Sequence, residues 1–193
     1  GSDTFRAYLM FMGPFDEGGD WNDQGITGID RFLKKVWRFC QLPNSEEVPP
    51  KKDLQVLHQT IHTVKNDLNE MKFNTAISRL MEFINYFSSH ESTTMDIKLN
   101  LIKMIAPLTP HIAEELWEIN GGESSIFLES YPEYDPALAE EDSVTIAIQV
   151  NGKLRGNINV PKTVSKEDLL ISAREQENVS IHLDNKDVIK EIV

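Results

Sequence analysis

The first 120 residues carry apolar positions at helical spacing, separated by short polar segments. The clearest pattern lies at 51–71, where apolar residues recur at alternating intervals of three and four positions: Leu54, Leu57, Ile61, Val64, Leu68 and Met71. This spacing gives a helix one apolar seam that can pack antiparallel against a neighbouring helix. The segment is therefore predicted to be a packed helix.

The neighbouring segments predict further helices of the same kind. The first of them puts Phe5, Leu9 and Met12 on one stripe, with Asp3 or Thr4 as its N-cap. The predicted helices besides 51–71 cover residues 3–12, 25–40, 75–88 and 95–105, and a last one runs from Thr109-Pro110 to about residue 119. About five or six helices with short links predict a helical bundle, so the fold class is expected to be mainly α.

The pattern changes after Gly121-Gly122. Residues 133–142 hold five acidic residues and no basic one, which is typical of a solvated boundary. Beyond it, residues 144–150 alternate between apolar and polar, Asn151-Gly152 is a strong hairpin signal, and residues 153–160 alternate again. This part is predicted to begin with a β-hairpin.

The remaining residues predict one helix and short strands. Ser165 is expected to cap a helix that runs to about residue 177, and residues 179–183 and 187–193 have strand-like composition. We therefore expect a helical domain at 1–132, an acidic linker at 133–143 and a small α+β domain at 144–193. Because about 50 residues bury too little surface to be stable alone, this domain is expected to be truncated, with its last strand missing.

The amino-acid composition argues against several classes of protein. The chain has 19 Lys and Arg against 31 Asp and Glu, a formal net charge of -12, which argues against a free-standing basic clamp on nucleic acid. The single cysteine, Cys40, excludes an internal disulfide framework and a thiolate metal cluster, and fits a reducing cytoplasm. No run of 18 apolar residues is present, so no membrane partner is expected.

No catalytic or metal site is predicted. His58 and His62 have the four-residue spacing of zinc ligands on a helix, but the residues between them include no Glu to act as a general base. The chain also lacks a Gly-rich phosphate loop after a strand and a serine nucleophile elbow. A zinc enzyme that uses these two histidines is therefore only a weak alternative.

Two local clusters of residues are basic, although the chain as a whole is acidic. Arg31, Lys34 or Lys35, and Arg38 form one basic stripe on the 25–40 helix, which is either a solvated face or a phosphate-contacting helix. Lys153 and Arg155 follow the predicted Asn-Gly turn, and strict alternation would put them on one strand face. They can either dock a nucleic-acid backbone or protect an edge strand.

At these residues the chain resembles bacterial-type leucyl-tRNA synthetases over almost its whole length. The matching segments are DTFRAYLMFMGPF with the later GITGIDRFLKKVWRF, then NTAISRLMEFIN, MIAPLTPHIAEELWE and VTIAIQVNGKLRGNINVPKTVSKEDLL. The resemblance implies a class I synthetase anticodon-binding helical bundle followed by the start of the small C-terminal domain.

What the resemblance implies about function is specific. The parent enzyme would use ATP with Mg²⁺ to attach leucine to its tRNA, while the catalytic and editing domains would lie upstream and leave this part inactive and without a cofactor. The resemblance places tRNA contacts on Arg31, Lys35, Arg38, Lys153 and Arg155, and implies a cytoplasmic protein. The partners expected are the tRNA for leucine and the upstream domains of the same chain, with this part itself monomeric.

An alternative from another class is an acidic helical protein-interaction adaptor, whose 54–71 seam would be exposed to receive a partner helix. An adaptor would show an exposed apolar groove with Arg31 and Arg38 held in internal salt bridges. A docking module would instead present these arginines on a solvent-facing basic strip.

The tryptophans Trp21, Trp37 and Trp117 are expected to be packing anchors. In modules that stack nucleobases, aromatic residues alternate with Lys and Arg on a sheet face, and this pattern is not found here.

Overall fold

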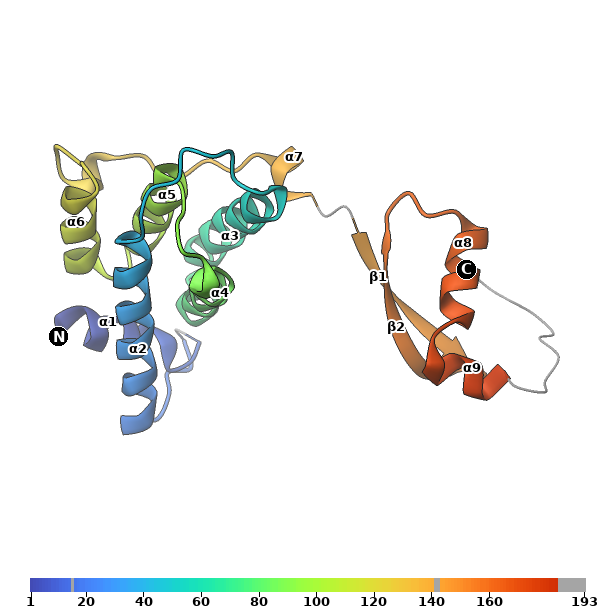
Figure 1. Cartoon of the computed structure of the whole chain (residues 1–193). Helices are drawn as coiled ribbons and strands as arrows, with labels where there is room; N and C mark the ends of the chain where they lie inside the picture. The colour runs from blue at the N-terminus through green and yellow to red at the C-terminus, as the bar shows by residue number, and fades with distance from the viewer. Residues whose placement is uncertain (15, 141–142, 184–193) are drawn as a thin grey trace. The chain divides into compact units, whose positions relative to one another are not determined.

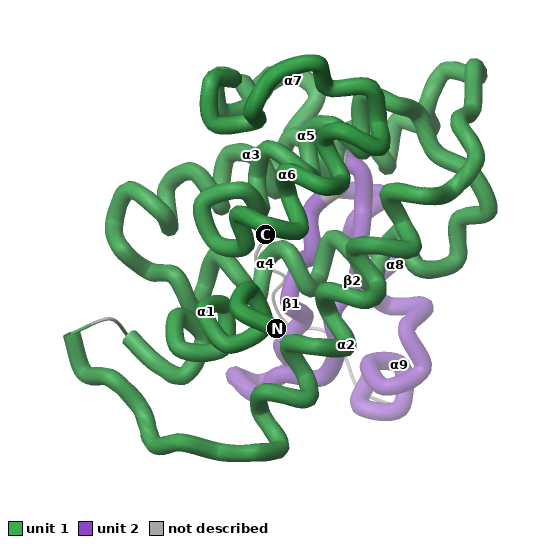
Figure 2. The backbone as a smooth tube through the Cα atoms, turned by 90° about the vertical axis from the view of Figure 1, so that its left-hand side faces the viewer, with its two compact units in different colours: residues 1–140 green, residues 141–193 purple. Residues whose placement is uncertain are grey.

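The structure, a computed structural model, describes residues 1–14, 16–140 and 143–183 (Figure 1). The chain divides into two compact units, Gly1–Glu140 and Glu141–Val193, shown in separate colours in Figure 2. The main helices of the first unit are α1 (Ser2–Phe11), α2 (Asp23–Cys40), α3 (Lys51–Asn69), α4 (Phe73–Tyr86), α5 (Met95–Ile105) and α6 (Pro110–Ile119). The predicted mainly α fold and helical bundle are confirmed.

The predicted seam on α3 forms part of the bundle core. Leu57, Ile61 and Val64 are completely buried, and α3 packs most extensively against α4. Facing them in the same core are the α4 residues Ala76, Ile77, Leu80, Phe83 and Ile84. The seam is therefore already occupied by neighbouring helices, which contradicts the adaptor arrangement in which it stays open.

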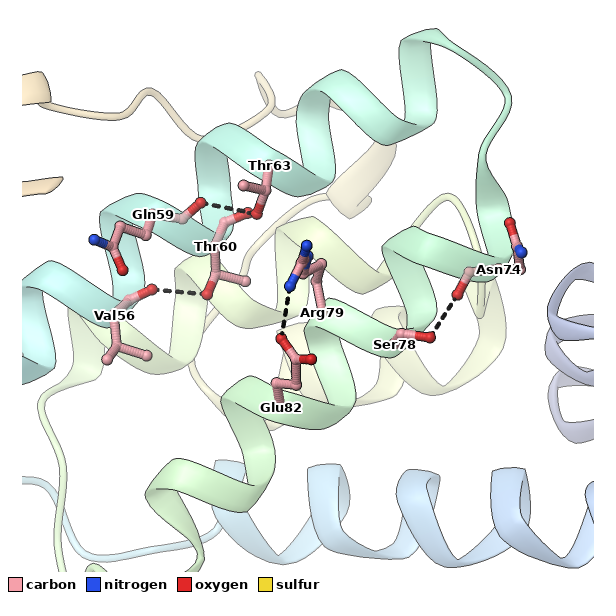
Figure 3. A network of polar contacts seen from close by, with 8 residues as sticks. All are labelled: Val56, Gln59, Thr60, Thr63, Asn74, Ser78, Arg79 and Glu82. Atoms are coloured by element: carbon pink, nitrogen blue, oxygen red, sulfur yellow. Dashed lines mark hydrogen bonds and ion pairs between the residues drawn. The ribbon is translucent and has the colours of Figure 1, made fainter. Parts of the chain in front are cut away.

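The hydroxyl groups of Thr60 on α3 and Ser78 on α4 are satisfied within their own helix. Thr60 donates to the carbonyl of Val56 at 2.7 Å, and Ser78 donates to the carbonyl of Asn74 at 2.9 Å (Figure 3). Because these bonds run to the residue four positions earlier, polar side chains enter the helical packing without needing a partner on another element.

The first helix differs from its predicted burial. Phe5 and Leu9, expected on a core stripe, are 48% and 49% exposed, whereas Ala7 and Tyr8 are buried. The side-chain oxygen of Asp3 does not cap its own helix, because Gly1 occupies the N-cap position of α1. The face of α1 that is buried depends on its neighbours α2, α4 and α6, which the local pattern does not contain.

A buried lysine holds the connection between α2 and α3. The Lys98 ammonium, on α5, donates to the carbonyl of Leu42 and, at 2.7 Å, to the side-chain oxygen of Asn44. Burial lowers the pKa of Lys98, and the nearby Cys40 thiol opposes that shift. Thr93 reinforces the attachment, since its carbonyl accepts from the Ser45 N–H at 2.9 Å. The predicted turn-rich segment 41–50 is thus fixed by non-local contacts.

The expected acidic linker is mostly part of the first unit. A short helix, α7 (Pro136–Ala139), packs against α3, where Gln59 donates to the carbonyl of Ala139 at 2.8 Å. The centre of the Tyr134 ring lies 4.3 Å from the centre of the His62 ring. Residues 133–140 therefore belong to a unit that ends at residue 140, not at the expected boundary of 132, because side chains of α3 hydrogen-bond their backbone.

The second unit begins with the predicted hairpin, formed by β1 (Ser143–Val150) and β2 (Lys153–Pro161) paired antiparallel. Asn151 and Gly152 both have positive φ, as a two-residue hairpin turn requires. Two helices follow, α8 (Lys166–Arg174) and α9 (Glu177–Leu183). Ile158 and Val160 of β2 pack with Leu169 of α8, so α8 contributes to the small core.

The predictions for the end of the chain have mixed outcomes. The Ser165 hydroxyl accepts from the Asp168 N–H at 3.1 Å, so the predicted cap of α8 is confirmed. The expected strand at 179–183 is wrong, because these residues form helix α9 and bury Val179. The expected strand at 187–193 lies outside the described residues.

Candidate nucleic-acid interface

Helix α2 divides its residues between a buried face and a basic face. The buried residues are Ile29, Phe32, Leu33, Val36, Phe39 and Cys40. Arg31, Lys35 and Arg38 are exposed, and their four- and three-residue spacing aligns them along the opposite side of the helix. We call these three residues the α2 basic face. It extends about 10 Å along the helix axis.

The start of α2 is fixed by the first helix. The Asn22 side chain accepts from the Gln24 N–H at 2.8 Å and so caps α2. The phenol of Tyr8 donates to the Asn22 carbonyl at 2.8 Å and accepts from the Asn22 N–H at 2.7 Å. Because both contacts hold the residue that caps α2, the basic face is carried by a rigid, anchored helix.

The cations of α2 differ in how far nearby groups offset their charge. Lys34 forms an ion pair with Asp30 at 2.7 Å, so much of its charge is balanced locally. Lys35 donates to the neutral side-chain oxygen of Asn85 at 2.7 Å, a contact that brings no carboxylate to offset its charge. Arg31 and Arg38 make no side-chain hydrogen bond or ion pair with any residue that the structure describes.

Two other cations of the first unit, Arg79 and Lys103, are paired with carboxylates and show the contrast. Arg79 on α4 contacts Glu82 at 3.1 Å (Figure 3). Lys103 on α5 pairs with Glu129 at 2.9 Å and lies 5.2 Å from the centre of the Trp117 ring. These charges are offset by neighbouring carboxylates. The α2 basic face is instead available to an external anion, although the chain is acidic overall.

The second pair of predicted residues lies on the hairpin of the second unit. Lys153 is exposed and pairs with Val150 across the turn. Gln149 pairs with Leu154 whereas Ile148 pairs with Gly156, so Arg155 is an extra residue on β2, a β-bulge. Arg155 is half-buried, and its Nε has no hydrogen-bond partner among the residues described. The bulge interrupts the strict alternation expected for Lys153 and Arg155.

The two histidines with zinc-like spacing have structural contacts instead. His58 Nδ1 accepts from the Asp135 N–H at 3.0 Å, and His62 Nε2 lies 3.2 Å from the side-chain nitrogen of Asn66. Within the described part of the chain, no group of three or more His, Cys, Asp or Glu side chains could hold a metal ion. Both histidines therefore help to hold the 134–140 segment or their own helix.

Sequence reasoning missed the role of Asn85. This residue belongs to α4, fifty positions away from Lys35, and its amide oxygen fixes the Lys35 ammonium beside the two arginines. The pattern of α4 gives no signal for such a contact, because Asn85 lies at a polar position of an amphipathic helix.

Among the helices that the structure describes, none has both the length and the apolar character that a membrane span requires.

Comparison with known proteins gives a consistent result. Residues 51–171 match the family described as the anticodon-binding domain of tRNA ligase. Over its full length the chain is 44% identical to the leucine–tRNA ligase of Chlorobium chlorochromatii (strain CaD3) and 41% identical to that of Chlorobium phaeobacteroides (strain BS1), covering 25% of each. The chain thus spans about a quarter of the length of these curated relatives.

A solved structure is similar over the whole chain. It is the crystal structure of the ternary complex of the Agrobacterium radiobacter K84 agnB2 LeuRS with tRNA and LeuAMS, with a TM-score of 0.76 and 26% sequence identity. The match covers 100% of the present chain and 28% of that protein.

Proposed function

Because the chain belongs to the family of anticodon-binding domains of tRNA ligases, we propose that it is the tRNA-docking part of a leucine–tRNA ligase. Its relatives at 40–44% identity are leucine–tRNA ligases, and a structural neighbour is a LeuRS in complex with tRNA. The observation that carries the docking role is the α2 basic face, whose two arginines have no partner among the described residues.

The proposed mechanism is positioning. The guanidinium groups of Arg31 and Arg38 present planar donors that match phosphate oxygens, while Lys35 adds a point charge between them. Binding a polyanion across this face releases counterions and fixes the register of the RNA, but carries little sequence information. A docked tRNA would then present its 3′ end to a remote active site, converting aminoacylation into a reaction of pre-oriented groups.

The acidic composition is compatible with this role. At physiological salt, surface fields are screened within about 8–10 Å, so acids elsewhere on the molecule have little effect on a phosphate that contacts α2 directly. The same acids keep RNA from binding indiscriminately, because like charges disfavour non-specific contact.

The hairpin is proposed to provide a second, separate contact with tRNA. Lys153 is exposed beside the tight turn, and Arg155 is placed by a bulge, a feature that commonly re-aims a side chain on a strand.

The remainder of the ligase is also part of the proposal. The nucleotide-binding catalytic domain and the editing domain would lie upstream in the same chain, where ATP with Mg²⁺ would bind. No residue of the present chain is assigned to that chemistry, so this part is expected to be catalytically inactive. It is also proposed to be cytoplasmic and, by itself, monomeric.

The test uses the full-length ligase with Arg31→Gln and Arg38→Gln combined. The affinity for tRNA should fall, and the slope of log affinity against log salt should become shallower by about two, one for each lost phosphate contact. Leucine-dependent ATP–pyrophosphate exchange should be nearly unchanged, because that reaction does not involve tRNA.

Arg79→Gln is the matched control, since it removes an exposed arginine that is already paired with Glu82. Its salt slope should remain that of the unmodified enzyme. Unchanged tRNA affinity in the Arg31/Arg38 double variant would refute the docking role of α2, whereas equal loss of exchange and tRNA binding would indicate misfolding.

A further inference from the structure

A lysine and an asparagine join α2 to α4 at the surface of the first unit. The Lys35 ammonium donates to Oδ1 of Asn85 at 2.7 Å, and both side chains are exposed. Because a lysine ammonium can only donate, the Asn85 amide turns its oxygen toward Lys35. The Nδ2 group of the amide makes no hydrogen bond with any residue that the structure describes. The contact therefore presents a cation and amide N–H donors side by side.

The two residues are held together by the packing of α2 on α4. Phe39 lies one turn after Lys35 on α2, and its ring centre is 6.0 Å from that of Phe83 and 5.3 Å from that of Phe87. All three rings are buried. Since Asn85 lies midway between Phe83 and Phe87 in the sequence, the buried aromatic rings fix the backbone that carries it. Little side-chain freedom would be lost when a ligand binds to this pair.

The neutral partner of Lys35 distinguishes it from the preceding lysine. Lys34 pairs with the carboxylate of Asp30 at 2.7 Å, so a negative charge lies next to its ammonium. Lys35 is held at the same distance by an amide, which orients the ammonium but has no net charge. No residue in the described part of the chain forms an ion pair with Lys35. A phosphate that approaches Lys35 thus meets an oriented cation without a competing carboxylate.

We propose that Asn85 is a further tRNA contact, which extends the α2 basic face onto α4. This inference rests on the proposed function. The Oδ1 atom of Asn85 positions the Lys35 ammonium, and its Nδ2 group donates to an oxygen of the phosphate that Lys35 binds. Asparagine side chains are among the groups that commonly donate to phosphate oxygens of nucleic acids. Lys35 and Asn85 then hold one phosphate from two helices, which fixes the register of the RNA.

The test measures the affinity of the full-length ligase for tRNA over a range of salt concentrations. Asn85→Ala removes a donor but no charge, so the affinity should fall by about 3-fold to 10-fold while the salt slope stays unchanged. Asn85→Asp also places a carboxylate beside the Lys35 ammonium. The affinity should then fall further, and the slope of log affinity against log salt should become shallower by about one.

Asn66→Asp is the matched control for the added charge. Asn66 is an exposed residue of α3, and its amide nitrogen lies 3.2 Å from Nε2 of His62. This variant should keep the affinity and the salt slope of the parent. In a Lys35→Gln background, Asn85→Asp should leave the salt slope unchanged, because the charge that it offsets is already absent.

The same variants separate a contact with RNA from a role in folding. Because Asn85 is exposed, both of its replacements should keep the parent's Tm and its leucine-dependent ATP–pyrophosphate exchange. Loss of exchange in proportion to tRNA affinity would overturn the inference, since Asn85 would then only support the fold. Parent-like affinity of Asn85→Ala, or an unchanged salt slope in Asn85→Asp, would also overturn it.

The two proposals fail in distinguishable ways. If tRNA binding weakens in the Arg31/Arg38 double variant but not in either Asn85 variant, only the role of Asn85 is refuted. If none of these variants changes tRNA binding, the docking role of α2 is refuted as well. A full-length protein without leucine-dependent exchange would refute the proposed function itself.

Discussion

The carboxylate of Asp3 accepts a hydrogen bond from the backbone N–H of Ile112 at 2.7 Å, joining two residues that are 109 positions apart. Its other oxygen lies 2.8 Å from Nδ1 of His111. Ile112 is in the first turn of α6, where backbone N–H groups have no partner within the helix. Asp3 therefore caps α6 from α1 and ties the first helix to the last long helix of the bundle.

Replacing Asp3 with alanine should lower the free energy of unfolding by about 1–2 kcal/mol, because a helix N-terminus loses its cap and a partly buried N–H loses its acceptor. Urea unfolding followed by circular dichroism measures the change. Glu17→Ala, which removes an exposed acid from the loop after α1, should have almost no effect. Equal stability of the Asp3 variant and the parent would show that the contact contributes nothing.

Gly122 is expected to tolerate no side chain. A Cβ at this position would overlap the indole ring of Trp117, whose N–H donates to the carbonyl of Ser124 at 2.9 Å in the same turn. Gly122→Ala should therefore lower the melting temperature clearly. Gly28→Ala is the matched control, because a Cβ there would meet open space on α2. It should stabilise the protein by up to about 1 kcal/mol through helix propensity. Gly122→Ala with an unchanged melting temperature would contradict the proposed packing.

Cys40 should be unreactive in the folded protein. Burial raises the pKa of its thiol to about 12, and the nearby Lys98 ammonium opposes that shift. Since the thiolate is the reactive form, Cys40 should resist an aromatic disulfide reagent at about pH 8 until the chain unfolds. The absorbance of the released thiol reports the reaction, and the chain in concentrated guanidinium chloride gives the full signal. Complete labelling of the native protein within the mixing time would refute the expectation.

Tyr86 links stability to alkaline pH. Its phenol donates to the buried Asp53 carboxylate at 2.8 Å, and burial, followed by this contact, raises the pKa of Tyr86 from 10.0 to about 12. A raised pKa favours the protonated folded form, so this stabilisation is complete below pH 10 and is lost as the pH rises through about 12. Tyr86→Phe should remove this pH dependence.

The same Tyr86→Phe variant should lose about 1–3 kcal/mol of stability at neutral pH, because the Asp53 carboxylate loses a donor. Urea unfolding at a series of pH values measures both effects. Tyr134→Phe is the control, since Tyr134 is exposed. A parent and a Tyr86 variant whose stabilities decline in parallel above pH 10 would rule out the linkage.

Much of the fold followed from local patterns. The α3 seam and the Asn-Gly turn were predictable because helical period and turn geometry are set by residues close in sequence. The burial of α1 was not, since Phe5 and Leu9 have the spacing of core residues yet remain exposed. The strand predicted at 179–183 is wrong because the alternating segment Val-Ser-Ile-His-Leu is too short for its pattern to distinguish helix from strand.

The candidate nucleic-acid interface could likewise be predicted only in part from the sequence. The spacing of Arg31, Lys35 and Arg38 is sufficient to predict that they lie on one side of a helix, because that relation depends only on helical geometry. Whether these charges are balanced depends on groups far away in the sequence. Asn85, a neutral partner for Lys35, could not be found from the pattern of either helix.

The sequence by itself determined the helical bundle, the hairpin and the alignment of cations along α2, since each depends on interactions between residues a few positions apart. Only the tertiary structure decided that Arg31 and Arg38 have no acidic partner among the described residues and that residues 133–140 pack on α3. It also decided that Phe5 and Leu9 of α1 are exposed. The physical reason is that burial and charge compensation are set by groups that only folding brings together.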